Sequence, residues 1–175
     1  MLADTNGPVD PAPIEGSVSW ELRGPDGALK REGVAHNIIT TVGDQMYAER
    51  GAGLAGAPAA PTGMKLGSGS TAPSKTGAGA ALVTYLANSH QAFSSAPSGG
   101  AGANGARRVT YAATFAAGKA TTGSAITEAV IVNEALADST SAAAATVARV
   151  LLTGIGSKGA GDTLTLTWTH DIGGS

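Results

Sequence analysis

The sequence predicts a mainly β protein, an antiparallel β-sandwich of jelly-roll-like type with one short α-helix and long glycine-rich loops. Several segments alternate apolar and polar residues with the period of two that is typical of a half-buried strand. Turn-forming stretches separate these segments, and only one stretch changes to a helical period. The 26 glycines and 8 prolines among 175 residues favour ordered strands joined by long loops over disorder throughout.

The first 15 residues are expected to form an extended Pro-containing arm, and residues 16–175 a single domain. Residues 1–15 contain three prolines and no apolar period, and proline neither donates a ladder hydrogen bond nor continues a helix. Two interpretations of the arm stay open. It is either a loose tail, as chain termini usually are, or an arm that lies along a neighbouring subunit.

A hairpin and the one helix are predicted next. Residues 17–23 alternate strictly, and a Gly-Pro-Asp-Gly turn separates them from residues 28–36, so the two segments read as paired strands. The period then changes. Thr40 or Thr41 can cap a helix by accepting a backbone hydrogen bond, and glycines follow ten residues later. We therefore expect the helix at about 41–50.

The middle of the chain is expected to consist mostly of loops. Small and turn-forming residues surround one short strand at 64–66. Residues 82–94 read as a strand with a break near Asn88. Residues 95–106 have many glycines and nothing to bury, so they predict a long flexible loop.

The C-terminal half carries the clearest strand patterns, at 107–117, 126–133, 146–153 and 163–172. In the last of these, every second residue is apolar or His, and threonines stand between them. A threonine row suits an outer face or a face between subunits. Aromatic residues are only 4% of the chain, so each buried ring should supply a large share of the core. The predicted core residues are Trp20, Tyr111, Phe115, Leu164, Leu166 and Trp168.

Several patterns resemble catalytic or ligand-binding motifs, but the residues around them do not fit those functions. Residues 154–159 match G-x-G-x-x-G, but a strand follows, whereas dinucleotide binding needs a helix N-terminus there, so we interpret them as a hairpin loop. The three histidines share no metal-ligand spacing. His170, at the end of a strand face, is expected to be a partly buried polar residue. Glu128 and Glu134 could pair as in a glycosidase, but nothing predicts a cleft, so we interpret them as solvated surface carboxylates. We predict no enzymatic activity, and no catalytic, cofactor-binding or metal-binding residues.

The charge pattern argues against two classes of partner. The net charge is −2 and no basic stripe is present, so nucleic-acid binding has little electrostatic support. No apolar run approaches the roughly 20 residues of a membrane-spanning helix. We therefore expect neither nucleic acid nor membrane as a partner, and instead expect contacts with other proteins.

Most of the chain resembles a family of tailed-bacteriophage virion proteins. The features that carry the resemblance are LGSGSTAPSKTGAGA at 66–80, RRVTYAATFAAGKA at 107–120, ITEAVIVNEA at 126–135, VARVLLT at 147–153 and KGAGDTLTLTWTHDI at 158–172. The segment HNIITTVGDQMYAER upstream is similar to the helix that precedes the first motif in such proteins. The family implies no catalytic residues.

The resemblance implies a structural virion protein, in the first place a capsid decoration (cement) protein that binds and stabilises the major capsid lattice. The alternative is a tail-fibre or baseplate component that recognises host glycans, although the loops 51–63 and 95–106 lack the aromatic residues usual in glycan sites. Expected partners are the major capsid protein and copies of the chain itself, as a homo-trimer or dimer. The expected location is the capsid surface, or alternatively the tail, of a virion assembled in the host bacterial cytoplasm.

Overall fold

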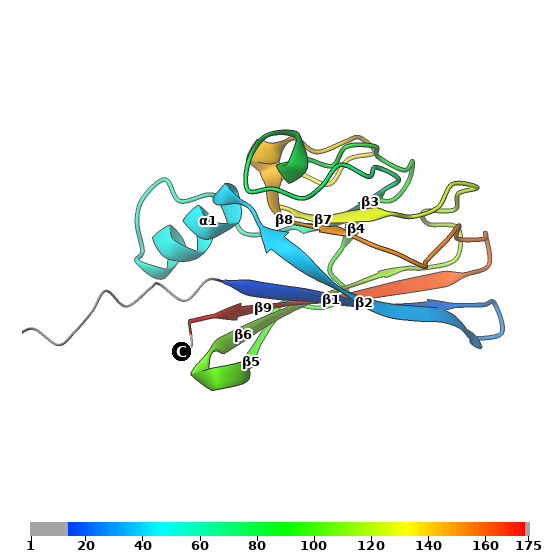
Figure 1. The fold of residues 1–175 in the computed structure, drawn as a ribbon, viewed down its shortest axis with the longest axis horizontal. Coiled ribbons are helices and arrows are strands. Elements are labelled where there is room, and N and C mark those ends of the chain that lie inside the picture. The colour runs from blue at the N-terminus through cyan, green and yellow to red at the C-terminus, as the bar shows by residue number, and fades with distance from the viewer. Residues whose placement is uncertain (1–13, 174–175) are drawn as a thin grey trace, which may run out of the picture.

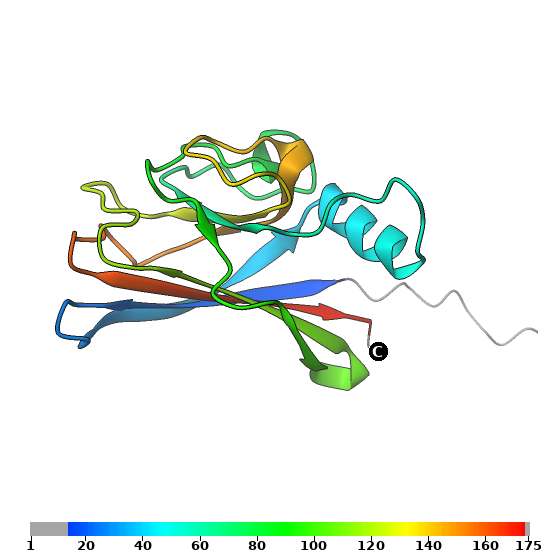
Figure 2. The ribbon, with the colours of Figure 1, turned by 180° about the vertical axis from the view of Figure 1, so that it is seen from behind.

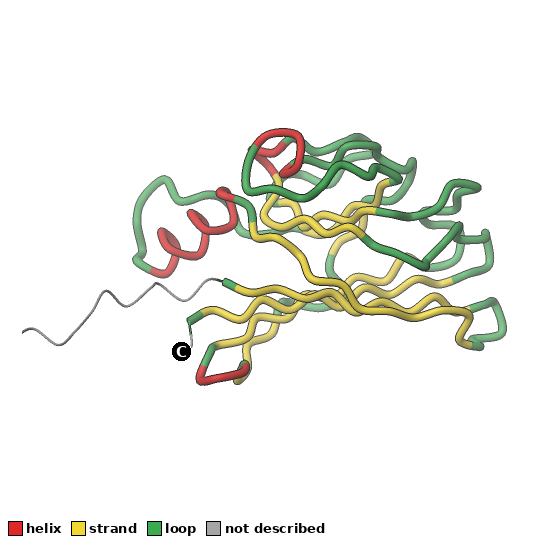
Figure 3. Tube along the Cα trace, viewed as in Figure 1, coloured by secondary structure: helices red, strands yellow, loops and turns green. Residues whose placement is uncertain are grey.

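The computed structural model describes residues 14–173, and the mainly β class with one α-helix is confirmed there (Figures 1 and 3). The elements, in chain order, are β1 (Glu15–Arg23), β2 (Leu29–Ile39), α1 (Thr41–Gly51), β3 (Gly63–Gly67), η1 (Gly77–Ala80), β4 (Gln91–Ala92), β5 (Ser98–Ala101), η2 (Ala103–Gly105), β6 (Arg107–Phe115), β7 (Glu128–Val132), η3 (Ala143–Ala145), β8 (Thr146–Leu151) and β9 (Thr163–Ile172). Most of the predicted arm, residues 1–13, lies outside the described residues. Ile14 already packs against the core, and β1 begins at the next residue.

The strands form one antiparallel sheet in the order β4-β3-β7-β8-β2-β1-β9-β6-β5. The sheet curls into a half-barrel, so that its two halves face each other across the core (Figure 1). We call β2, β1, β9, β6 and β5 the β9 half, and β8, β7, β3 and β4 the β7 half. Strand β2 joins them, because it pairs with β1 along most of its length and with β8 only through Ile38 and Ile39.

A second connection closes the other side of the curl. Strand β4 pairs with β3 in the β7 half, and β5 pairs with β6 in the β9 half. Between them the backbone N–H of Ser94 donates to the carbonyl of Ala112 on β6, at 2.8 Å. Figure 2 shows this segment descending from one half to the other.

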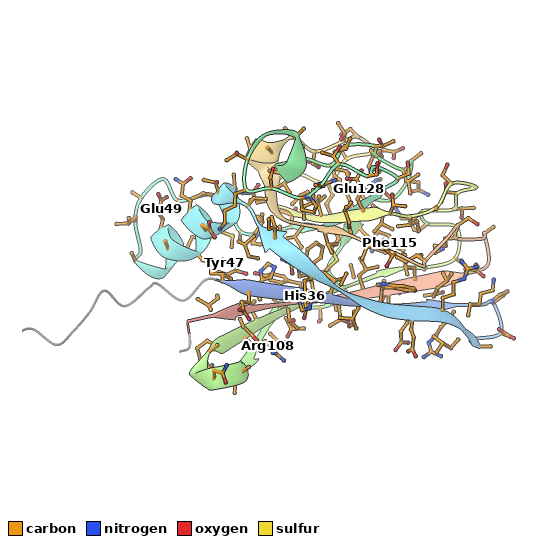
Figure 4. The ribbon with its side chains drawn as sticks, viewed as in Figure 1. His36, Tyr47, Glu49, Arg108, Phe115 and Glu128 are labelled. Atoms are coloured by element: carbon orange, nitrogen blue, oxygen red, sulfur yellow. The ribbon has the colours of Figure 1, made fainter. Side chains whose placement is uncertain are left out.

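The hydrophobic core fills the space between the two halves. Because side chains alternate along a strand, the inward residues of β1, β6 and β9 meet those of β3, β7 and β8. The six residues predicted to form the core all lie here: Trp20, Tyr111, Phe115, Leu164, Leu166 and Trp168 are between 0% and 4% exposed. Phe115 is labelled in Figure 4 between the two halves.

Helix α1 lies at one end of the curl, directly after β2 (Figure 1). Thr40 is its N-cap: the buried hydroxyl accepts from the Gly43 N–H at 3.2 Å and donates to the Thr146 carbonyl at 2.5 Å. Gly43 lets the helix approach β8 closely, since a Cβ there would lie 2.3 Å from the Val147 carbonyl oxygen. Met46 is buried beneath the helix.

Three segments differ from the sequence-based expectation. Within 82–94 only Gln91–Ala92 forms a strand, because Asn88 takes a left-handed conformation (φ 55°) that interrupts an extended chain. Residues 98–101, expected in a flexible loop, form β5 by pairing with β6. The connection 152–162 is not a hairpin loop, because it leads from β8 in one half to β9 in the other.

Candidate functional site

The outward side of the β9 half carries mostly small side chains, with Glu21 and Glu32 side by side in the row of Thr165. In the register of the sheet, Ser19 lies opposite both Val34 and Thr167, and Thr167 lies opposite Ala112. The next row is similar: the hydroxyls of Ser17 and Thr169 are 2.8 Å apart. We call this surface the threonine face and define it by Ser17, Ser19, Val34, Thr110, Ala112, Thr114, Thr165, Thr167 and Thr169.

A shallow depression lies near the middle of the threonine face. Its lining includes Ser19, Val34 and Thr167, together with Trp20 and the two carboxylates Glu21 and Glu32. Gly33 makes room for the indole, because a Cβ on Gly33 would lie 2.6 Å from Trp20 Cζ2. Val34, on β2 at one side of this surface, is 71% exposed.

Besides Glu21 and Glu32 within this surface, charged residues lie at the ends of the strands. Arg23 pairs with Glu21 at 2.7 Å, and Arg108 pairs with Asp171 at 2.6 Å. The hydrogen bond from Arg108, which brings a positive charge, holds the pKa of the Asp171 carboxyl below its usual value. His36 and Arg108, which come from β2 and β6, are labelled in Figure 4. The two arginines Arg23 and Arg108 are therefore already paired within one chain.

The outward side of the β7 half is covered by the chain's own loops. Glu128 on β7 and Arg149 on β8 are both fully buried, with Nη2 and Oε2 2.7 Å apart. Arg149 also donates to the carbonyls of Thr71 and Gly79, at 2.7 and 3.1 Å. The other carboxylate oxygen of Glu128 (labelled in Figure 4) accepts from backbone N–H groups, including that of Thr84 at 2.8 Å. The ion pair thus fastens residues 69–84 over the sheet.

A second buried cation fastens the other covering loop. Lys65 on β3 is fully buried, and its Nζ donates to Glu134 at 2.9 Å and to the Ser139 carbonyl at 3.0 Å. The ring of Tyr85 lies 5.8 Å from the same nitrogen. Partial burial alone would raise the pKa of Glu134, but the hydrogen bond from Ser141 and the contact with Lys65 together hold it below its usual value.

The interpretation of Glu128 and Glu134 as solvated surface carboxylates is wrong. Glu128 is fully buried and Glu134 is about one third exposed. Both carboxylates accept hydrogen bonds that hold loops to the sheet, so their role is structural. The two carboxylates are shielded from water because two loops cover a side of the sheet that would otherwise face solvent.

A neutral polar cluster joins α1 to the β9 half. The hydroxyl of Tyr47, labelled in Figure 4, lies 2.7 Å from Nδ1 of His170 and 2.8 Å from the hydroxyl of Tyr111. Burial lowers the pKa of His170 to about 3, although the nearby Asp171 acts in the opposite direction. Burial likewise raises the pKa of both tyrosines. These groups therefore stay uncharged near neutral pH and serve as hydrogen-bond partners. His170, expected to be partly buried, is fully buried.

The glycine motif at 154–159 lies in the connection between β8 and β9, and a strand follows it. Arg31 donates to the Ile155 carbonyl at 2.7 Å, and buried Lys158 donates to the Ala116 carbonyl at 2.9 Å. These contacts fold the motif against the protein. Within residues 14–173, no three His, Asp or Glu side chains are grouped so as to hold a metal ion. No helix in that part of the chain is long and apolar enough to cross a membrane.

Sequence reasoning missed the buried cations Lys65, Arg149 and Lys158. Arg149 did give a signal, since it interrupts an apolar run, VARVLLT, that otherwise predicts burial on both faces. Its partner Glu128 interrupts the apolar pattern of the adjacent strand in the same way. Their pairing depends on the register that places Val130 opposite Arg149, and one sequence does not show that register.

Comparisons with known proteins add no relative, because no family model, curated protein or solved structure matches the chain.

Proposed function

We propose that the protein is a structural, non-enzymatic component of a tailed-bacteriophage virion, most specifically a capsid decoration protein that binds and stabilises the major capsid lattice. The motifs at 66–80, 107–120 and 158–172 support the virion assignment by their resemblance to that family. The structural observation that carries the proposal is the contrast between the two outward sides of the sheet. One is covered by the chain's own loops, whereas the other is bare and consists mostly of Ser, Thr and Ala side chains, with Glu21 and Glu32 beside them.

The use of the buried charged groups supports a structural role. Glu128, Arg149 and Lys65 direct their hydrogen bonds to each other, to Glu134 and to backbone groups of the covering loops. A catalytic group has to face a space that a substrate can enter. These groups instead stabilise the fold, and the bare outer surface is left for contacts with other proteins.

We further infer that the curled sheet is an antiparallel β-sandwich of jelly-roll-like type. Its support is the single core enclosed between the β9 half and the β7 half, with chain crossings at β2 and at residues 91–101. Such a scaffold presents flat sheet faces and loop ends to its neighbours. On this proposal the partners are the major capsid protein and copies of the chain, in a particle assembled in the host bacterial cytoplasm.

Reconstitution tests the proposal. Particles are grown from a phage that lacks this chain, purified protein is added, and the bound fraction is measured after sedimentation of separated heads and tails. We expect saturable binding to heads, together with a higher temperature of head rupture. Binding to tails alone would replace the cement role with the alternative, a tail component in host recognition. Binding to neither would reject the virion assignment.

A further inference from the structure

We propose that α1 is an acid-sensitive latch at the end of the curl, which protonation of the buried His170 releases from the sheet. The part that is released is α1 together with the loop that follows it, while the strands stay paired. Its release uncovers the end of the core where Met46 is buried. This inference goes beyond the proposed function and does not rest on it, so each can fail without the other.

His170 lies where the helix meets the sheet. Its side chain, on β9, is fully buried, and its Nδ1 lies 2.7 Å from the hydroxyl of Tyr47 on α1. The two rings meet edge to face, with their centroids 5.8 Å apart. Figure 4 labels Tyr47 between α1 and the strands of the β9 half. Release of α1 therefore takes away a side chain that covers the imidazole.

The groups that contact the imidazole are uncharged. The Tyr47 hydroxyl also lies 2.8 Å from that of Tyr111 on β6, and burial keeps both tyrosines neutral by raising their pKa. On the other side of the ring, Nε2 lies 3.5 Å from the amide nitrogen of Asn37 on β2. Gly16 of β1, which is opposite both Asn37 and His170, carries no side chain. A neutral imidazole can bond to these groups, whereas a charged one finds no counter-charge among them.

The charged groups of the same elements do not offset this. Asp171, the next residue of β9, lies on the outward side of the sheet, where Arg108 binds its two oxygens at 2.7 and 2.6 Å. Asp171 favours protonation of His170, but burial outweighs its effect. Arg107 of β6 is exposed and has the wrong sign of charge. The remaining titratable groups lie on the outward side of the sheet or have partners of their own on α1, and these are Glu15, His36, Asp44 and Glu49.

Proton binding is therefore linked to opening of the helix. Burial lowers the pKa of His170 to about 3 while α1 is in place. Once α1 leaves, the ring meets water and its pKa returns toward the ordinary value of 6.5. Between these two values the open form binds a proton that the closed form excludes, so acid favours opening. From pH 7 to pH 5 the equilibrium constant for opening should increase about 25-fold.

The attachment of α1 allows such a local opening. Its buried residues are Gly43 and Met46, and residues 51–56 at its end and beyond it are exposed. At its N-terminus the buried Thr40 hydroxyl bonds to carbonyls of β8, so this end forms the hinge. A segment with few buried contacts opens at a lower free energy than the whole domain. The helix can therefore separate while the sheet stays folded.

Amide hydrogen exchange of the full chain tests the latch. Protection factors, which are corrected for the intrinsic effect of pH on exchange, are measured at pH 7 and pH 5. We expect the amides of α1 to be less protected than those of β1 at both pH values, and their protection to fall about 25-fold at pH 5. Equal protection in α1 and β1 would show that the helix does not open separately. Protection in α1 that is independent of pH would show that opening does not expose His170. Either result overturns the inference.

Three variants assign the change to His170. His170→Gln has a side chain that does not titrate, so it should abolish the fall in protection at pH 5. His36→Gln removes an exposed histidine and Asp44→Asn removes the ion pair of α1 with Lys75, so both should retain the fall. A His170→Gln protein that keeps the full change overturns the inference.

A second measurement uses wild type alone and serves if His170→Gln does not fold. The NMR signal of the His170 Cε1 proton should keep its position between pH 7 and pH 5, because the closed form excludes the added proton. A signal that follows an ordinary histidine titration in this range would show that the ring is already open to water, and it overturns the inference.

Discussion

At the scale of single residues, a few buried charges decide which side of the sheet is closed. Arg149 and Lys65 each link a strand of the β7 half to a loop that lies over it. A charge without a partner in such a place is strongly unfavourable, so the pairs act as specific fasteners for the loops. The threonine face has no such fastener.

Removal of the Arg149 side-chain charge should destabilise the fold strongly. Arg149→Met leaves the Glu128 carboxylate buried without its partner, which typically costs about 3–5 kcal/mol of unfolding free energy. The matched control is Arg23→Met, whose pair with Glu21 is about half exposed and should contribute less than about 1 kcal/mol. Urea denaturation measures both. Equal losses in the two variants would contradict the role given to Arg149.

His170 should make stability depend on pH. Its folded pKa is about 3 and its ordinary value is 6.5, so between these values the unfolded chain binds a proton that the folded protein excludes. Stability should therefore fall as pH drops from 6.5, by about 2 kcal/mol at pH 5. Carboxylates with lowered pKa, such as the adjacent Asp171, contribute mainly below that pH. The Tyr47 and Tyr111 hydroxyls that face His170 stay neutral throughout.

His170→Gln isolates this contribution, because it retains a polar side chain that does not titrate. Thermal unfolding of wild type and variant at pH 7, 6 and 5 should show the wild type losing more stability across the series. Parallel curves for the two proteins would show that His170 is not held neutral by burial.

At the scale of elements, the strand and helix periods of the sequence predicted those elements whose own residues carry a clear apolar pattern. The strict alternation at 163–172 matches β9, and the hairpin and helix match β1, β2 and α1 within a few residues at each end. Strand β5 was not predictable, because Ser-Gly-Gly-Ala has no apolar period and depends on β6 for its pairing. Residues 82–86 are extended in pattern, but they form only an isolated bridge, between Tyr85 and Gly67 of β3, and the N–H groups of Val83 and Thr84 donate to Glu128.

The candidate surface was predicted in part. The threonine row on 163–169 suggested an outward or inter-subunit face, which is what β9 contributes. Its partners on β1, β2 and β6 follow only from the register of the sheet. The burial of Glu128 could not be predicted, because it depends on loops far away in the sequence.

Helix α1 should depend on the Thr40 hydroxyl. Thr40→Val keeps the shape but leaves the Gly43 N–H uncapped and the Thr146 carbonyl without its donor, at a cost of about 1–2 kcal/mol. Thr40→Ser retains the hydroxyl and should recover most of that loss. Amide hydrogen exchange should show faster exchange in α1 of the Val variant with β9 unchanged. Equal exchange rates in the two variants would show that the Thr40 hydroxyl does not stabilise α1.

At the scale of the whole molecule, the two outward sides of the sheet differ in whether the chain's own loops cover them. The outward side of the β7 half is covered by the chain's own loops, whereas that of the β9 half is left uncovered. Helix α1 and the start of β1 lie at the same end of the curl (Figure 1).

Removal of residues 1–13 should separate stability from assembly. Because β1 begins at Glu15 and Ile14 packs on the core, the shortened chain should keep its unfolding free energy within about 1 kcal/mol of wild type. Its occupancy on particles should fall if the arm lies along a neighbouring subunit. Occupancy is measured by quantitative gel analysis of purified virions. An unchanged occupancy would favour the loose-tail interpretation.

The central claim is that the protein decorates the capsid, and antibody–gold labelling of intact particles by electron microscopy tests it most directly. Particles that lack this chain serve as the control for antibody specificity. The account predicts gold distributed evenly over the heads of wild-type particles. Gold confined to the tails, or wild-type particles labelled no more than the control, would contradict it.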